Sequence, residues 1–317
     1  MLNLVSTETR LQTAFQEDVL RGLSRARKSI PCRWLYDERG SELFEKITLL
    51  DEYYPTRTET MILRDYAEEM ATFTAQTVAL IEFGAGSGIK TEILLAAMSP
   101  ALYVPIDICG SFLNETAERL RRLFPQVETR PIVADFVEEF TLPAAVFHRG
   151  AKTAFFPGST IGNLTVLQAG ALLRRMRLHA GPFGSAIIGV DLKKDVEKLV
   201  RAYDDSEGIT AAFNLNLLDR MNRELAADFD SEQFGHESRW NEAESAVEMH
   251  LVSRAEQDVA IGHRLFTFQA GETIHTESSR KYDVVGFTAL VQANGWRVGR
   301  VWQDPDQAFA VFGLAAA

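Results

Sequence analysis

Residues 78–90 read V-A-L-I-E-F-G-A-G-S-G-I-K, and this stretch indicates the fold of the whole chain. The apolar run at 78–81 predicts a short buried strand. Glycines at 84, 86 and 88 follow it, and residues 91–98 then show a helical pattern. A strand, a glycine-rich turn and a helix in this order open a nucleotide-binding α/β unit, because glycines let the backbone turn sharply and approach a ligand closely.

The spacing of these glycines narrows the class of ligand. A dinucleotide-binding G-x-G-x-x-G pattern would need glycine at position 89, where the chain has Ile89. A Walker loop would use Lys90 and Thr91, but it also requires a glycine in place of Ile89. The pattern that remains is acidic-x-Gly-x-Gly-x-Gly, from Glu82 to Gly88. It resembles the first motif of Rossmann-like methyltransferases, which bind S-adenosylmethionine; a glycine-rich turn without a ligand is the alternative.

Four more apolar runs beyond the glycine loop predict strands that alternate with helices. They lie at 102–106, 131–134, 153–156 and 185–190. Such alternation implies a parallel sheet with right-handed crossovers and ligands at the carboxyl ends of the strands. Polar residues follow each predicted strand: Glu82, Asp107, Asp135, Asn163 and Asp191.

Two of these strand ends match the recognition of an adenosine group. Asp107 follows the strand after the glycine loop, where a carboxylate can accept hydrogen bonds from both ribose hydroxyls. Asp135 and Phe136, one strand further on, can offer a carboxylate to the adenine amino group and a ring to its face. The glycine loop and the two acids together predict adenosine binding more specifically than any one of them.

Composition excludes several classes of protein. The formal net charge of −11 over 317 residues argues against nucleic acid or an anionic membrane as a partner. Cys32 and Cys109 provide neither a disulfide framework nor a zinc motif, and the six histidines show no metal-binding spacing. The first residues lack the features of a signal peptide. We therefore expect a cytoplasmic monomer that acts on a small molecule and holds no metal.

Outside the α/β stretch, the pattern predicts helices at 9–27, 58–71 and much of 196–229. Ser41 is a candidate helix cap, and Pro55 should keep Tyr54 extended. Residues 234–241 read as a polar loop, whereas 247–261 and 264–268 alternate like antiparallel strands. A helix at 284–295 and strands at 296–302 and 309–314 should close the sheet.

This order predicts two domains. The first is an S-adenosylmethionine-binding domain of residues 57–192 and 282–317. The second is a substrate-binding domain of residues 1–56 and 193–281. The expected fold class is α/β, a Rossmann-like class I methyltransferase sheet with an inserted α+β substrate-binding domain.

Two amino-terminal stretches resemble a specific family. Residues 36–44 read Y-D-E-R-G-S-E-L-F and residues 52–57 read E-Y-Y-P-T-R. Together they resemble the signature of the histidine-specific N-alpha-methyltransferases, which trimethylate L-histidine to hercynine, the first step towards ergothioneine. The resemblance extends over nearly the whole chain and includes residues 158–163, 203–205 and 276–279.

The resemblance implies roles for individual residues. S-adenosylmethionine would be held by Tyr36, Gly84, Gly86, Lys90, Asp107, Asp135 and Phe136. The amine and carboxylate of the amino acid would be held by Tyr53, Asn163 and Tyr203. The imidazole would be held by Met249, Glu277 and Ser279. Tyr53 is the candidate catalytic residue.

Glu277 should determine which amino acid is methylated, because a carboxylate accepts an imidazole N–H and stabilises an imidazolium. Related family members methylate a tryptophan derivative, whose indole cannot use a carboxylate in the same way. An N-methyltransferase of another amino acid is therefore the alternative function. A non-catalytic adenosine-binding protein on the same fold is a second alternative.

Overall fold

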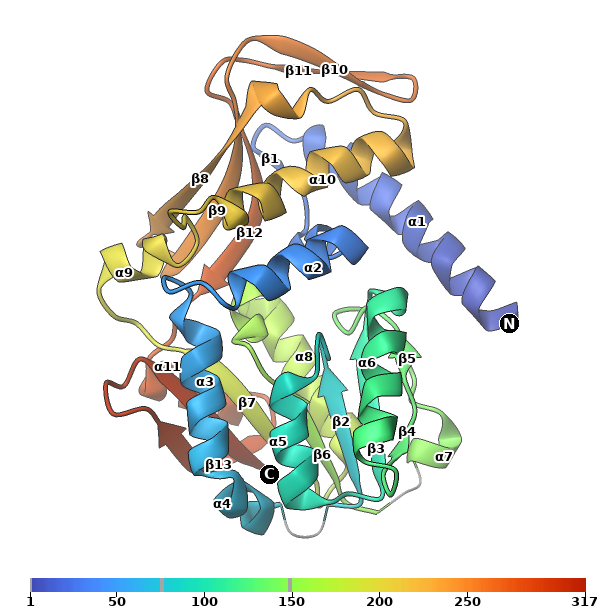
Figure 1. Cartoon of the computed structure of the whole chain (residues 1–317). Helices are drawn as coiled ribbons and strands as arrows, with labels where there is room; N and C mark the ends of the chain where they lie inside the picture. Colours follow the sequence, from blue (N-terminus) through green and yellow to red (C-terminus); the bar gives the residue numbers. More distant parts are fainter. Residues whose placement is uncertain (1, 75–76, 148–149) are drawn as a thin grey trace. The chain divides into compact units, whose positions relative to one another are not determined.

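The computed structural model describes residues 2–74, 77–147 and 150–317, and the chain divides into two compact units (Figure 1). The first unit comprises Met1–Tyr53 and Asp195–Ser278, and the second comprises Tyr54–Lys194 and Ser279–Ala317. Each unit therefore combines two separate stretches of the chain. The expected assignment of cofactor binding to 57–192 and 282–317, and of substrate binding to the remainder, stays a prediction.

The second unit is built on an eight-stranded sheet whose main path runs β13-β14-β7-β6-β2-β3-β4, with β5 paired to β3. Its strands are β2 Ala79–Phe83, β3 Leu102–Asp107, β4 Glu128–Thr129, β5 Ile132–Val133, β6 Lys152–Phe156, β7 Ser185–Asp191, β13 Trp296–Gln303 and β14 Phe309–Ala316. The pairs among β2 to β7 are parallel, whereas β14 pairs antiparallel with both β7 and β13. The predicted parallel α/β sheet and its closing strand pair are thus confirmed.

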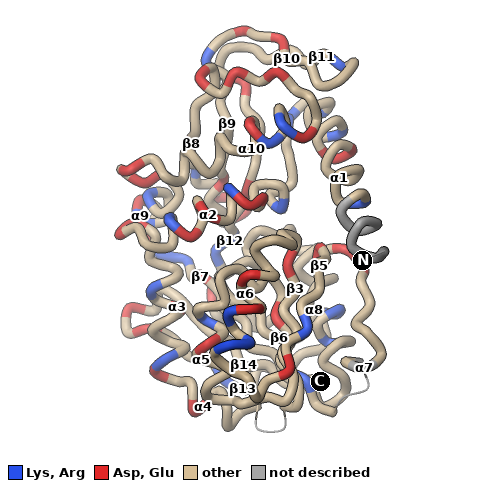
Figure 2. Tube along the Cα trace, turned by 45° about the vertical axis from the view of Figure 1, so that its right-hand side comes forward, with Lys and Arg blue, Asp and Glu red and all other residues tan. Residues whose placement is uncertain are grey.

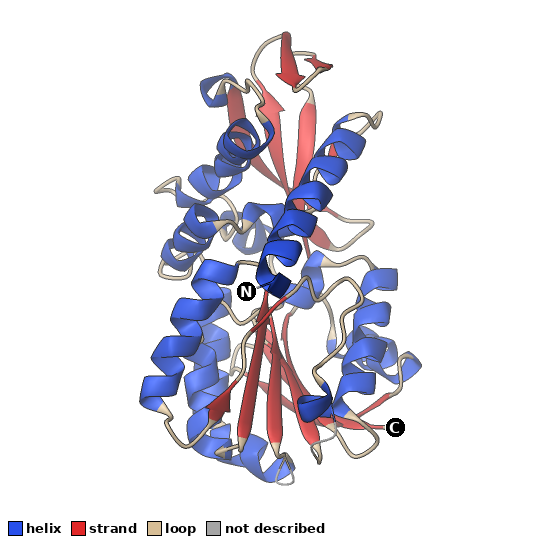
Figure 3. Ribbon diagram, turned by 90° about the vertical axis from the view of Figure 1, so that its right-hand side faces the viewer, coloured by secondary structure: helices blue, strands red, loops and turns tan. Residues whose placement is uncertain are grey.

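Helices cover both faces of this sheet, as Figure 3 shows. They are α3 Tyr54–Asp65, α4 Ala67–Phe73, α5 Ile89–Met98, α6 Gly110–Leu123, α7 Ala144–Phe147, α8 Val166–Ala180 and α11 Val284–Ala293, with the short 3-10 turn η2 Thr160–Asn163. Successive residues of a strand point to opposite faces. Accordingly Ile81 packs into a core with α8 and α11, whereas its neighbour Leu80 packs into a core with α3 to α6.

His179 is an unusual member of the core around α8. Its side chain is buried, and among the described residues neither ring nitrogen has a hydrogen-bond partner. The ring lies 4.9 Å from that of Phe140. Burial, followed by the charges of Arg175 and Lys152, lowers the pKa of His179 to about 4. The folded state therefore holds this imidazole neutral at pH values where the unfolded chain protonates it.

We expect His179→Phe to stabilise the protein on the acid side. The unfolded chain gains a proton as pH falls below about 6.5, which costs up to about 1.4 kcal/mol of stability per pH unit until the folded-state pKa is reached. Phenylalanine removes this penalty and keeps the contact with Phe140. Urea unfolding at pH 7 and pH 5 should show a smaller loss of stability for the variant. Equal losses in both proteins would contradict this account.

The first unit combines helices with two small antiparallel-rich sheets. Its helices are α1 Leu2–Leu23, α2 Glu38–Ile47, α9 Val196–Arg201 and α10 Ile209–Leu225, with the 3-10 turns η1 Cys32–Leu35 and η3 Ser231–Gln233. Its strands are β1 Lys28–Ser29, β8 Phe234–Asn241, β9 Ala246–Ser253, β10 Gln257–Ile261, β11 Arg264–Phe268 and β12 Thr273–Arg280. One sheet has the order β1-β12-β9-β8, and β10 pairs with β11 as a hairpin. The predicted antiparallel strands at 247–261 and 264–268 are confirmed.

The predicted polar loop at 234–241 is wrong, because these residues form β8 and pair with β9 from Phe234 to Asn241. β8 is the last strand of its sheet, and most of its side chains are only half-buried. An edge strand needs few apolar residues, so its sequence looks like that of a loop.

Local predictions near the amino terminus also need correction. Tyr54 is not extended but begins α3, and Pro55 sits in the first turn, where its missing N–H leaves no hydrogen bond unmade. Asp37, not Ser41, caps α2, because its side chain accepts a 2.7 Å hydrogen bond from the Gly40 N–H. The helix predicted at 58–71 is interrupted at Tyr66. None of the helices in the described part of the chain combines the length and hydrophobicity needed to cross a membrane.

Candidate active site

Three glycines shape the loop between β2 and α5. Their φ angles are +76° at Gly84, +50° at Gly86 and +69° at Gly88. Side chains disfavour this left-handed region, which explains the repeated glycines. An ideal Cβ on Gly86 would meet no described atom within 4 Å. The backbone at Gly86 therefore borders open space, as close approach of a ligand requires.

Asp107, at the end of β3, is hydrogen-bonded to this loop. Its Oδ2 accepts from the Gly86 N–H at 3.1 Å, and its Oδ1 accepts from the Cys109 N–H at 3.0 Å. Burial raises the pKa of Asp107, although backbone hydrogen bonds from Cys109 and Gly86 oppose this effect. The structure thus joins two of the predicted cofactor residues directly.

Phe136 meets the loop from the next strand end. An ideal Cβ on Gly84 would lie 3.4 Å from the Phe136 ring. Arg175 Nη1 donates to the carbonyl oxygens of Phe136 and Val137, at 2.7 and 3.0 Å. The preceding Asp135 accepts a 2.8 Å hydrogen bond from the Val137 N–H. This segment is therefore anchored to α8 and presents its aromatic ring beside the first glycine.

Glu82 is more deeply buried than Asp107 and Asp135, the strand-end acids of β3 and of the segment after β5. It is buried and accepts hydrogen bonds from Tyr103 and Thr91. Burial raises its pKa to about 8, even though these hydrogen bonds lower it. Glu82 therefore links β2 to α5 through Thr91 and to β3 through Tyr103, largely in its protonated form at neutral pH.

Lys90 has a partner that the sequence did not reveal. Its ammonium lies 2.5 Å from Oε2 of Glu59, a fully buried residue of α3. The same carboxylate accepts from the Gly158 N–H at 2.8 and 3.1 Å. An ideal Cβ on Gly189 would lie 1.9 Å from Glu59 Oε1, so this strand position has no room for a side chain. A glycine inside an apolar strand signals such a close approach.

Asn163 ends η2, the 3-10 turn between β6 and α8. The preceding Gly162 lies against the end of β12, where an ideal Cβ would be 2.7 Å from the carbonyl oxygen of Arg280. At the start of the loop, Ser159 Oγ accepts a 2.9 Å hydrogen bond from the Asp191 N–H. The structure therefore places Asn163 in the same neighbourhood as the end of β12, which carries Ser279.

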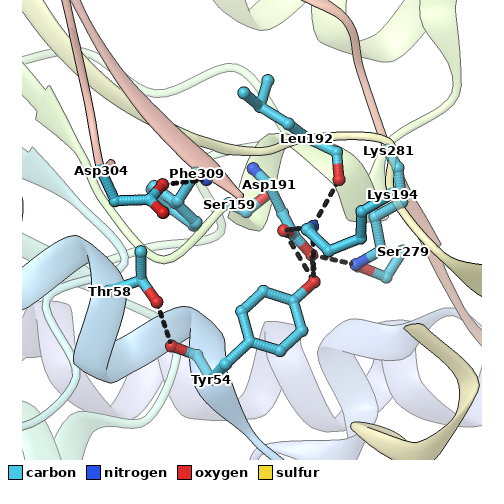
Figure 4. A network of polar contacts seen from close by, with 10 residues as sticks. All are labelled: Tyr54, Thr58, Ser159, Asp191, Leu192, Lys194, Ser279, Lys281, Asp304 and Phe309. Atoms are coloured by element: carbon cyan, nitrogen blue, oxygen red, sulfur yellow. Dashed lines mark hydrogen bonds and ion pairs between the residues drawn. The ribbon is translucent and has the colours of Figure 1, made fainter. Parts of the chain in front are cut away.

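Asp191, the last residue of β7, is the centre of a buried polar network (Figure 4). Its carboxylate accepts from the Tyr54 hydroxyl at 2.8 Å and pairs with the ammonium groups of Lys194 and Lys281, at 2.6 and 2.8 Å. Lys281 also donates to Ser279 Oγ at 2.8 Å. Ser279, one of the predicted substrate-binding residues, thus belongs to a polar network that could not be predicted from the sequence.

In the first unit, predicted site residues form an aromatic cluster. Tyr36 packs edge-on against Phe44 and Phe213, with ring centroids 5.5 and 5.3 Å apart. Tyr53 packs against Phe44 at 6.0 Å and against Tyr203 at 6.1 Å. Burial first, and then the charge of Glu277, raises the pKa of Tyr36 well above its usual value. Tyr36 therefore stays a neutral hydrogen-bonding group.

The backbone of Tyr203 is held by β8. Its carbonyl oxygen lies 2.8 Å from His236 Nε2 and accepts from Ser238 Oγ at 2.6 Å. Asn214 Nδ2 donates to His236 Nδ1 at 2.9 Å, so the proton of this imidazole sits on Nε2. Burial lowers the pKa of His236 and favours this neutral form. This support could not be predicted, because residues 234–241 have the composition of a loop.

The remaining predicted residues lie on neighbouring strands. Met249 on β9 is buried, and its carbonyl oxygen accepts from Thr276 Oγ1 at 3.1 Å. Glu277 and Ser279 are also buried and, two positions apart on β12, they share one face of that strand. Glu277 is the penultimate residue of the first unit, whereas Ser279 begins the second stretch of the second unit.

Charged residues of both signs occur in both units. Figure 2 shows Lys and Arg interspersed with Asp and Glu along both units. Among the described residues, no group of three or more His, Cys, Asp and Glu side chains is arranged to hold a metal ion.

Comparison with known proteins decides the family. A family model described as "Histidine-specific methyltransferase, SAM-dependent" matches residues 15–316. The chain belongs to this family. The predicted methyltransferase class and the predicted cofactor, S-adenosylmethionine, are thereby confirmed.

Two mycobacterial relatives of this histidine-specific methyltransferase match along nearly their whole length. The histidine N-alpha-methyltransferase of Mycobacterium tuberculosis is 42% identical over 299 residues, which cover 92% of this chain and 91% of that protein. The enzyme of the same name from Mycolicibacterium smegmatis is 39% identical over 310 residues, which cover 96% and 94%. Among solved structures, Streptomyces venezuelae DesVI aligns with a TM-score of 0.48 at 14% identity, covering 89% of this chain and 100% of that one.

The geometry of the second unit fits the family's cofactor. The glycine loop leaves room where a Cβ at position 86 would stand, Asp107 lies at the same loop, and Phe136 offers a ring beside Gly84. These features suit a ligand with a ribose, an aromatic base and a chain that follows the loop. The individual residue roles stay predictions.

A pair of glycine variants tests the loop. Gly86 and Gly262 both have positive φ, +50° and +58°, and an ideal Cβ on either meets nothing within 4 Å. Alanine at either site should cost about 1 kcal/mol of backbone strain. We expect only Gly86→Ala to weaken S-adenosylmethionine binding, by at least tenfold in calorimetry. Equal affinity in the two variants would show that the loop does not contact the cofactor.

Proposed function

We propose that this protein transfers methyl groups from S-adenosylmethionine to the α-amino group of L-histidine and forms Nα,Nα,Nα-trimethylhistidine, hercynine. Glu277 determines that the substrate is histidine, because an imidazole can donate an N–H to this buried carboxylate. Ser279, on the same face of β12, supplies a second polar group for the ring. The names of the two mycobacterial relatives support this substrate. The resemblance to the histidine-specific family implies that the reaction is the first step towards ergothioneine.

Within this proposal each group of residues has one task. Cofactor binding is assigned to Tyr36, Gly84, Gly86, Lys90, Asp107, Asp135 and Phe136. Asn163 and Tyr203 bind the carboxylate end of histidine, and Tyr53 binds its amine. Met249 provides an apolar wall for the imidazole. The carboxylates of Asp107 and Asp135 can accept hydrogen bonds from the hydroxyl and amino groups of the cofactor. The side chains of Asn163 and Tyr203 can donate hydrogen bonds to the carboxylate of histidine.

The bound cofactor supplies a methyl group activated on a sulfonium, so the protein chiefly has to position the nucleophile. The attacking amine must be neutral, whereas a free α-amine is mostly protonated near pH 7. The Tyr53 hydroxyl would accept a hydrogen bond from the amine and pass its proton to water. The faces of Tyr53 and Tyr203, whose rings lie 6.1 Å apart, would stabilise the methylated ammonium by cation–π attraction.

Tyr53→Phe tests this role. We expect kcat for methylation to fall about 10- to 100-fold, at or below the lower end of general acid–base effects, while S-adenosylmethionine affinity stays within twofold. Tyr66→Phe, which removes a hydroxyl at the break between α3 and α4, serves as the matched control. Unchanged turnover of Tyr53→Phe would remove Tyr53 from the mechanism.

The proposed substrate is tested by incubating the protein with S-adenosylmethionine and each of the twenty amino acids in turn. Formation of S-adenosylhomocysteine with histidine alone is the expected result. Turnover with tryptophan or another amino acid would preserve the class of enzyme and overturn the assignment of Glu277. The absence of turnover with every amino acid, despite cofactor binding, would favour the non-catalytic alternative.

We further propose that the protein acts as a cytoplasmic monomer on a small molecule, without nucleic acid or membrane as a partner. The net charge of −11 supports the proposal that neither nucleic acid nor an anionic membrane is a partner. Sedimentation of the purified protein tests the oligomeric state.

A further inference from the structure

Helix α6 holds the glycine loop by two successive carbonyl groups. The Thr116 hydroxyl donates to the carbonyl oxygen of Gly86 at 2.8 Å. Arg119 Nη2 donates to the next carbonyl oxygen along the chain, that of Ser87. An ideal Cβ on Gly88 would lie 2.9 Å from Thr116 Cγ2, so the glycine at this position lets α6 approach the loop closely. The Thr116 side chain is therefore built into the support of the loop.

The backbone of the loop leaves one N–H group without a partner. The other N–H groups of residues 84–88 are engaged: those of Gly84 and Ala85 donate to Ile106 O, that of Gly86 to Asp107 Oδ2, and that of Gly88 to Ala85 O. Within the part of the chain that the structure describes, the Ser87 N–H has no acceptor. A backbone donor in a folded protein normally has a partner, which solvent or a ligand supplies when the protein does not.

The bond from Thr116 fixes the direction of this N–H. The described residues contain no cis peptide bond, so the Gly86–Ser87 peptide is trans and planar. In such a peptide the C=O and the N–H point in opposite directions. Because the Gly86 C=O points towards Thr116 on α6, the Ser87 N–H points away from α6. Glycine restricts its own backbone very little, so this hydrogen bond is what prevents the peptide from rotating.

We infer that Thr116 is a positioning residue, which sets the Gly86–Ser87 peptide so that the Ser87 N–H donates to the carboxylate of the bound cofactor. This inference rests on the proposed function, in which the loop binds S-adenosylmethionine. The carboxylate is the only anionic group of this cofactor, since its sulfonium and its ammonium are cationic. A backbone N–H bonds an anionic oxygen more strongly than a neutral one. Helix α5 begins at Ile89, directly after the loop, and its N-terminal dipole favours the same negative charge.

The test compares two ligands by calorimetry in the absence of histidine. S-adenosylhomocysteine has the carboxylate, whereas 5′-methylthioadenosine has the adenosine and the thioether but no amino-acid group. Thr116→Val keeps the shape of the side chain and removes its hydroxyl. We expect it to weaken S-adenosylhomocysteine binding about tenfold and 5′-methylthioadenosine binding less than twofold, because only the first ligand has an acceptor for the Ser87 N–H. Thr116→Ser keeps the hydroxyl and should bind both ligands within twofold of the wild type.

Thr74→Val is the matched control. Thr74 is 5% exposed, close to the 4% of Thr116, and its hydroxyl donates to the carbonyl oxygen of Met70 at 2.7 Å, far along the chain from the glycine loop. This variant should lose similar stability and bind both ligands normally. Equal weakening of the two ligands in Thr116→Val would overturn the inference and leave Thr116 a structural role alone. Unchanged S-adenosylhomocysteine affinity would overturn it as well.

The wild-type protein provides a second measurement, which decides the question if Thr116→Val does not fold. The NMR resonance of the Ser87 amide proton should shift downfield with S-adenosylhomocysteine and stay in place with 5′-methylthioadenosine. The same shift with both ligands, or no shift with either, would overturn the inference. Both measurements read binding alone. A protein that gives the expected results but leaves histidine unmethylated would therefore refute the proposed substrate and not the role of Thr116.

Discussion

Glu277→Ala is expected to lower kcat/KM for L-histidine about 100- to 1,000-fold and to leave the affinity for S-adenosylmethionine unchanged. The variant removes a charge-assisted hydrogen bond to the imidazole and leaves the ring N–H without its acceptor. Losses of this kind amount to about 3–4 kcal/mol in a buried site. Steady-state kinetics with histidine and calorimetry with the cofactor measure the two quantities separately.

Two variants on the same strand sharpen this experiment. Glu277→Gln keeps the shape and an acceptor oxygen but loses the charge, so its activity should lie between those of the wild type and the alanine variant. Ser278→Ala changes the intervening residue, which points to the other face of β12 and bonds His275. Its kcat/KM should stay within about threefold of the wild type. Full activity of Glu277→Ala would reject the imidazole assignment.

Asp107→Ala is expected to weaken S-adenosylmethionine binding by at least 100-fold. It removes the carboxylate proposed to accept from the ribose hydroxyls, and each charge-assisted hydrogen bond is worth about 1.5–3 kcal/mol. It also frees the Gly86 N–H, which Asp107 holds at 3.1 Å, so the glycine loop loses its support. Calorimetric titration of the cofactor measures the effect.

Asp304 offers the appropriate comparison in the same unit. Its carboxylate is buried and accepts from the Phe309 and Asp306 N–H groups at 2.7 and 3.1 Å, much as that of Asp107 does at its own loop. Asp304→Ala should therefore lower stability similarly and bind the cofactor normally. If the two variants lost affinity equally, Asp107 would have only a structural role.

The architecture of the second unit could be predicted because its signals are local. The run at 78–81, the glycines after it and the acid at 107 each mark one strand end, and parallel strands bring their carboxyl ends to one edge of a sheet. The direct Gly86–Asp107 hydrogen bond follows from this rule. The final strand pair of the sheet could be predicted in the same way, because the chain ends with a helix and two apolar strands. In the structure β14 pairs antiparallel with β13 and β7.

The residues that support the site could not be predicted, because their partners are distant in the sequence. Glu59 reaches Lys90 and Gly158, and Tyr54 reaches Asp191, across stretches that no periodic pattern links. Gly189 is a local indication of the Glu59 contact, since a glycine in an apolar strand indicates that another group approaches the strand closely. The contact of His236 with Tyr203 could not be predicted either, because His236 lies on the edge strand β8, whose composition is that of a loop.

The central claim is tested most directly by mass spectrometry of the product formed from L-histidine and S-adenosylmethionine, with fragmentation to locate the added groups. The account predicts a gain of three methyl groups, all on the α-nitrogen, with intermediate forms consumed as the reaction proceeds. Methyl groups on the imidazole ring, or histidine that remains unmodified while another amino acid is methylated, would contradict it.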